Sequence, residues 1–257
     1  MNESPLLPPN LPTTAPATES AIARFAADYR PMAGGVTPAW VTELLLKQPA
    51  ALVHEICENR AWPVALVLLG LGTVCLLAYG AVMGSFAGGH QYWATSLKFL
   101  TGTFLTALIC LPSLYIFTCL GGGRQSLPQV LHLLLLCTAL CGVLLLGFAP
   151  IVWVFSQSTN AVGFMGLLHL TAWIVAAGLS LRLMVTAMRF LNRRSMNILV
   201  GWCFIFIVVS LQMSTCLRPL IGPPDRGLLE PEKKSFFKHW HDCLSDCHPP
   251  STGTIAA

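Results

Sequence analysis

Long runs of apolar residues dominate the chain and alternate with short polar breaks. The run over residues 127–155 contains no Asp, Glu, Lys or Arg. About 20 apolar residues allow a helix to cross the hydrocarbon core of a bilayer. Similar runs occupy about 63–86, 97–120, 161–188 and 196–217. The pattern predicts an all-α membrane protein, with a bundle of about five transmembrane helices over residues 62–218.

The chain before the first apolar run is polar and should divide into two parts. Residues 1–20 are rich in Pro and Thr, a composition typical of a disordered tail. Residues 21–61 favour short amphipathic helices, because Trp40, Leu44, Leu52 and Ile56 recur at helical spacing. The intervening polar positions on these helices are Glu43, Lys47, Glu55 and Glu58.

Local signals refine the boundaries of this amphipathic segment. Thr37 followed by Pro38 is typical of an N-cap with proline in the first helical turn. Pro49 should then divide the segment into two helices. Two interpretations account for the segment. It binds a partner or the membrane surface, or it simply packs on the chain's own bundle. Residues 219–257 predict a polar C-terminal tail.

Glycine and proline mark positions of packing and bending within the apolar runs. Gly80, Gly84 and Gly88 recur every four residues and share one helix face, where a neighbouring backbone can approach closely. They predict helix contacts within the bundle or between two copies. Pro112 and Pro150 lie inside their helices and predict bends, because proline lacks the amide proton of a helical hydrogen bond.

Three ionisable side chains fall within the spans: His132, His169 and Arg182. Such residues are functional candidates by default. Hydrogen bonding near a helix end would explain His132, and snorkelling to the interface or a structural pair would explain Arg182. No Asp or Glu lies in any span, which argues against a proton-coupled transporter.

Composition and charge agree with a membrane location. Only 10% of the residues are charged and 54% are hydrophobic, whereas soluble domains carry about 25% charged residues. The net charge of +4 is dispersed, so no nucleic-acid partner is expected. The loops after the second and fourth spans contain Arg124, Arg189, Arg193 and Arg194. The positive-inside rule therefore predicts a cytoplasmic N-terminus, although the basic C-terminal tail opposes it.

The C-terminal tail carries a cluster of metal-ligand residue types, namely His239, His241, Cys243, Cys247 and His248. Zinc sites use such residues, usually in two separated pairs. A local zinc site, a Cys243–Cys247 disulfide and a solvated tail are the three interpretations. The sequence contains no catalytic motif, and no cofactor is predicted.

Several short motifs carry a family resemblance: residues 79–85 (YGAVMGS), 111–117 (LPSLYIF), 148–150 (FAP), 155–159 (FSQST) and 211–219 (LQMSTCLRP). Together they resemble an uncharacterised family of bacterial multi-pass inner-membrane proteins, some labelled as containing an actin-binding WH2 domain. The five-span plan is also similar to the Yip family of membrane-organising proteins. The resemblance implies a bacterial inner-membrane location but no activity.

Two functional hypotheses follow, and neither is catalytic. The first is a membrane-organising or partner-scaffolding protein, whose partners are the lipid bilayer and other membrane proteins or a second copy. The alternative is a permease or channel component in which the helices bent at Pro112 and Pro150 line a cavity. An enzyme acting on lipid or thiol substrates would depend on the tail cluster alone.

Overall fold

The computed structural model describes residues 17–31, 34–59, 61–85, 91–159, 162–191 and 197–216, and every regular element in these ranges is helical. The elements are α1 (Ala17–Asp28), α2 (Pro38–Lys47), α3 (Pro49–His54), the π-helical turn η1 (Glu55–Asn59), α4 (Ala61–Ser85), α5 (Gln91–Leu120), α6 (Leu127–Ser158), α7 (Val162–Leu191) and α8 (Asn197–Cys216). The all-α prediction is confirmed. Helix α1 begins inside the tail that was expected to lack structure.

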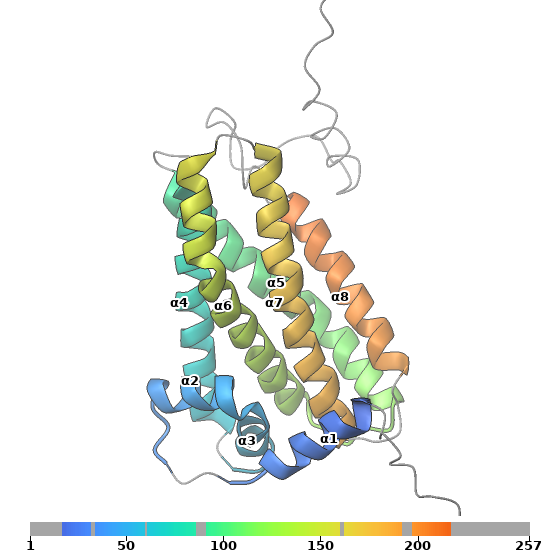
Figure 1. Ribbon diagram of the computed structural model, residues 1–257. Coiled ribbons are helices and arrows are strands. Elements are labelled where there is room, and N and C mark those ends of the chain that lie inside the picture. The colour runs from blue at the N-terminus through green and yellow to red at the C-terminus, as the bar shows by residue number, and fades with distance from the viewer. Residues whose placement is uncertain are drawn as a thin grey trace, which may run out of the picture.

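Helices α4 to α8 stand side by side as a bundle, and α1 to α3 lie across its lower end (Figure 1). Four of them, α4 to α7, are long and apolar enough to cross a membrane. Helix α8 has 20 residues, and its apolar part, Leu199–Met213, is shorter than the four spans. The chain is an integral membrane protein with a bundle of about five helices.

Exposed tryptophans mark the two ends of this bundle. Trp62, in the first turn of α4, is 67% exposed near the lower end. Trp93, near the start of α5, is 83% exposed at the opposite end. Trp side chains favour the two membrane–water interfaces. Their positions fit a bilayer that surrounds the apolar sides of α4 to α8.

The helices pack most closely where small residues face each other. A Cβ atom added to Gly80 would lie 2.7 Å from the Cα atom of Ser96 on α5. Gly84 is buried as well, and Gly88 lies outside the described residues. A second close approach, between α4 and α6, uses Gly72 and Gly142. Gly72 and Gly142 belong to no repeat in the sequence, so local spacing does not predict this pair.

The N-terminal helices are integral parts of the same core. The Trp40 backbone amide donates to the Thr37 hydroxyl at 3.3 Å, so the predicted N-cap is present. Pro49 begins α3, as predicted from its position between two helical patterns. Six apolar side chains from these helices are at most 1% exposed and belong to the core cluster that includes α4 and α6: Val41, Leu45, Ala51, Leu52, Val53 and Ile56. We call α1 to η1 the cap.

Candidate functional site

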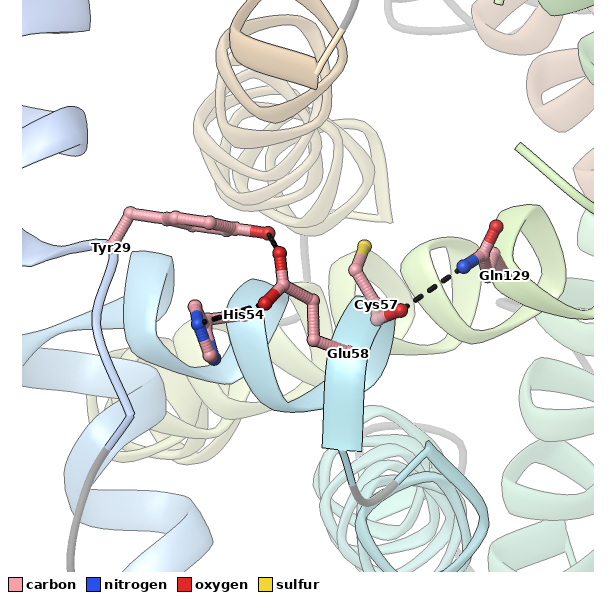
Figure 2. Close-up of polar contacts among 5 residues, drawn as sticks. All are labelled: Tyr29, His54, Cys57, Glu58 and Gln129. Carbon is pink, nitrogen blue, oxygen red and sulfur yellow. Dashed lines mark hydrogen bonds and ion pairs between the residues drawn. The ribbon is translucent and has the colours of Figure 1, made fainter. Parts of the chain in front are cut away.

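A polar cluster of five residues joins the cap to the bundle: Tyr29, His54, Cys57, Glu58 and Gln129 (Figure 2). The carboxylate of Glu58 receives two contacts. Its Oε1 accepts from the Tyr29 hydroxyl at 3.4 Å, and its Oε2 lies 3.3 Å from Nε2 of His54. The Tyr29 ring also meets the His54 ring edge-on at 4.8 Å. The cluster therefore fastens the segment after α1 to the end of α3.

Gln129 fastens the other side of this cluster to α6. Its Nε2 donates to the backbone carbonyl of Cys57 at 3.1 Å, and its Oε1 accepts from the Ser126 amide at 2.9 Å. One side chain thus holds the π-helical turn and the beginning of α6 together. The only signal for this site in the sequence was the presence of polar residues among many apolar ones. Gln129 and Cys57 are 72 positions apart. Their contact could not be predicted from local spacing.

The π-helical turn η1 carries the acidic residues of this region. Such turns are rare and often occur at functional sites. Glu55, one of the polar positions between the apolar ones, is only 2% exposed. Glu58 keeps a more open position, with 57% of its side chain exposed.

Electrostatics in the cap favour protonated groups beside Glu58. Burial, and then the nearby charge of Glu58, raise the pKa of the Cys57 thiol to about 11. Burial likewise raises the pKa of the Tyr29 hydroxyl well above its usual range, and Cys57 and Glu58 add to the shift. A thiol with a raised pKa is a poor nucleophile at neutral pH. This cluster is therefore suited to holding the cap, not to covalent catalysis.

A second polar site lies inside the bundle. The Tyr79 hydroxyl is 3.1 Å from Nδ1 of His169, linking α4 to α7. Both side chains are buried, and the Phe99 ring lies 5.5 Å from the Tyr79 ring. The other imidazole nitrogen, Nε2, has no hydrogen-bond partner in the described part of the chain. An unsatisfied buried polar atom is uncommon and calls for a functional or structural explanation.

His132 is equally buried but differently placed. It is 2% exposed near the start of α6, and the Trp62 ring covers it edge-on at 5.4 Å. Neither imidazole nitrogen has a hydrogen-bond partner among the described residues. The hydrogen bond expected for it near the helix end is therefore not seen. Its position indicates aromatic packing with Trp62 at the lower membrane interface.

Arg182 differs from both histidines because it lies on the outer surface of α7. The helix ends at Leu191, nine positions after Arg182. The two ion pairs in the described ranges, Lys47 with Glu43 and His54 with Glu58, do not include it. The structure thus places this guanidinium on a surface otherwise covered by exposed apolar side chains.

Both prolines lie inside helices and on the exterior of the bundle. Pro112 in α5 and Pro150 in α6 are exposed. The Ser113 hydroxyl donates to the Cys110 carbonyl at 2.8 Å, and the indole nitrogen of Trp202 lies 3.3 Å from that same oxygen. Trp202, on α8, is fully buried. The region around Pro112 is therefore a packed contact between α5 and α8.

No group of three or more His, Cys, Asp or Glu side chains is placed to hold a metal ion within the described ranges. The predicted cluster of His239, His241, Cys243, Cys247 and His248 lies outside those ranges. Its three interpretations therefore stay predictions.

No family model matches the chain, and neither the curated proteins nor the solved structures compared with it include a significant match. The family resemblance drawn from the short motifs stays a prediction. Functional inference for this protein therefore depends on the geometry of its own residues.

Proposed function

We propose that this integral membrane protein organises or scaffolds partner proteins and that the cap is its cytoplasmic docking platform. One observation carries the proposal: the cap and the membrane helices share a single apolar core. A cap built into the core is held rigidly, and a rigid surface binds partners at a low entropic cost. Its outer face presents Glu43, Leu46 and Lys47, all exposed.

The distribution of arginines supports the cytoplasmic orientation. Arg124 follows α5 and Arg189 lies in the last turn of α7, at the same end of the bundle as the cap. Short loops rich in Arg and Lys remain on the cytoplasmic side of membranes. With the family resemblance, this favours a bacterial inner membrane with α1 to α3 facing the cytoplasm.

The packing around the helix-breaking residues also favours scaffolding over transport. Both prolines face outward, and Ala149, beside Pro150, is buried in the core. Most buried hydroxyls donate to the carbonyl four residues earlier in their own helix, as Thr106, Thr118, Thr138 and Ser180 do. Such hydroxyls need no water or solute, because their hydrogen bonds are already made.

Site-specific photo-crosslinking in cells tests the scaffold proposal. A photoreactive residue at Leu46, 56% exposed on α2, should give discrete protein adducts. The matched control is Leu66 on α4, which is 62% exposed but faces lipid. Adducts at Leu46 that disappear in Glu43→Lys would support a cap docking platform. The absence of protein adducts at Leu46, Glu43 and Lys47 would overturn it.

A permease or channel component is the second candidate, favoured by the Tyr79–His169 pair. The unpartnered Nε2 of His169 offers a solute one hydrogen-bonding atom within the membrane region. This function requires water near the bends. A cysteine at Ala149 that reacts with a membrane-impermeant thiol reagent would support it, whereas an inert cysteine there would support packing.

A further inference from the structure

We propose that the exposed side of α7 around Arg182 is a docking surface for a transmembrane helix of another protein that carries an Asp or Glu carboxylate within the bilayer. This inference rests on the proposed scaffolding function and defines the chemistry of one partner. The surface consists of Ile174, Val175, Gly178, Leu179 and Arg182, and all five are exposed.

The residues around Arg182 show that this surface points away from the chain's own core. Ala177 and Met184, on the opposite side of α7, are buried. Val175 and Leu179 are nearly half exposed on the same side as Arg182. A charged group and large apolar groups thus share one lipid-facing side of the helix. An intramembrane charge in such a place is a functional candidate by default.

A bilayer centred on α7 places Arg182 at the depth of the hydrocarbon core. Helix α7 runs from Val162 to Leu191, so its midpoint falls between residues 176 and 177. Arg182 is therefore about 8 Å from the midpoint along the axis, at a rise of about 1.5 Å per residue. The hydrocarbon core extends about 15 Å on either side of its centre. Its Cα atom then lies several ångströms inside the apolar layer.

Helix direction makes snorkelling to the near interface unfavourable for this side chain. Every Cα–Cβ bond of a helix tilts toward the helix N-terminus. Helix α7 begins at the upper end of the bundle and ends beside the cap (Figure 1). The side chain of Arg182 therefore leaves the backbone toward the bilayer centre. A carboxylate next to the guanidinium would therefore stabilise its charge better than a side chain that turns back toward the near interface.

The chain itself offers no counter-charge at this depth. Its sequence contains no Asp or Glu between Glu58 and Asp225, a stretch that includes all five membrane helices. A second copy of the protein lacks an intramembrane carboxylate for the same reason. Phospholipid phosphates lie at the interface, outside the hydrocarbon layer in which Arg182 is placed. The geometry thus points to a carboxylate on a foreign transmembrane helix.

Space is available for such a helix next to the charge. A Cβ atom added to Gly178, one turn before Arg182, would meet nothing within 4 Å. Small residues let two helix backbones approach closely in a membrane. A partner helix that crosses α7 at Gly178 would bring its carboxylate into reach of the guanidinium. The Arg–carboxylate pair can then form two parallel hydrogen bonds.

A designed peptide tests the proposal without knowledge of the natural partner. The full chain, carrying a donor fluorophore, is placed in phosphatidylcholine nanodiscs. Its partner is an acceptor-labelled Leu/Ala transmembrane peptide with one Asp at the depth of Arg182 or with Leu at that position. We expect the Asp peptide to bind about tenfold more tightly than the Leu peptide. Arg182→Gln should remove this preference, and the loop variant Arg124→Gln should keep it.

Two results would overturn the proposal. The first is that the wild-type protein binds the Asp peptide and the Leu peptide equally tightly, while the wild-type and Arg182→Gln proteins unfold at the same temperature. The second is a lipid result: Arg182-dependent retention of phosphatidylglycerol in native mass spectrometry, without competition from the Asp peptide. The peptide assay does not involve the cap, so its failure leaves the Leu46 crosslinking test intact. Conversely, loss of adducts at Leu46 would not alter peptide binding.

Discussion

Gly80 of α4 lies directly against the backbone of Ser96 on α5, since an added Cβ atom would lie 2.7 Å from the Ser96 Cα. Real Cβ atoms essentially never come that close to another heavy atom. The neighbour is backbone and cannot rotate away as a flexible side chain could. The contact therefore fixes the distance between two membrane helices.

Gly80→Ala should destabilise the protein, although alanine is the better helix former. Overpacking of this kind costs about 1–3 kcal/mol. Gly70→Ala is the matched control on the same helix, because a Cβ atom there meets nothing within 4 Å. We expect thermal unfolding in detergent to show a lower Tm for Gly80→Ala and an unchanged or higher Tm for Gly70→Ala. Equal Tm values would contradict the close contact.

Tyr79→Phe should destabilise the bundle by about 1–3 kcal/mol, because it leaves the imidazole of His169 buried with neither nitrogen paired. Replacing both polar partners can leave the free energy of unfolding nearly unchanged, since no buried polar atom is then left without a hydrogen bond. We therefore expect Tyr79→Phe/His169→Leu to cost less than the sum of the two single substitutions. A double-mutant cycle of unfolding free energies measures this coupling. Strict additivity would show that the pair does not interact.

Cys57 should react slowly with iodoacetamide at pH 8, and its rate should rise up to about pH 11, following its raised pKa. Peptide-level mass spectrometry of the native chain measures this rate. Glu58→Gln removes the neighbouring negative charge, so its profile should shift to lower pH. A profile unchanged by Glu58→Gln would contradict the electrostatic contribution of Glu58.

The raised pKa of Cys57 also makes the stability of the cap depend on pH. The thiol pKa rises from 9.0 to about 11, so folding favours the protonated form. This contribution is fully present below pH 9 and is lost as the pH rises to about 11. Tyr29, whose pKa is also raised, acts in the same direction. Limited proteolysis between α1 and α2 should therefore accelerate above pH 9.

Reporter fusions should place the two ends of α6 on opposite sides of the membrane. The loop at Arg124 lies at the cap end, and Ser158 ends α6 at the other. A cytoplasmic reporter fused after Arg124 should be active, and one fused after Ser158 should be inactive. A periplasmic reporter should show the reverse. The same outcome at both positions would exclude α6 as a membrane span.

The apolar runs alone determined the class of the protein. About 20 apolar residues in lipid must form a helix, because no water is present to satisfy the backbone amides and carbonyls. The N-cap at Thr37 and the start of α3 at Pro49 were equally accessible, since both depend on neighbouring residues only. Local chemistry thus fixed where helices begin and end.

Only the tertiary structure decided which face of each helix is internal. Gly80 and Gly70 are both glycines of α4, yet only Gly80 meets another backbone. His169 is enclosed in the bundle, whereas Arg182, 13 residues later on the same helix, faces outward. In a soluble helix the polar face would have shown this division. In a membrane, lipid and neighbouring helices both favour apolar side chains, so the sequence pattern does not distinguish the two faces.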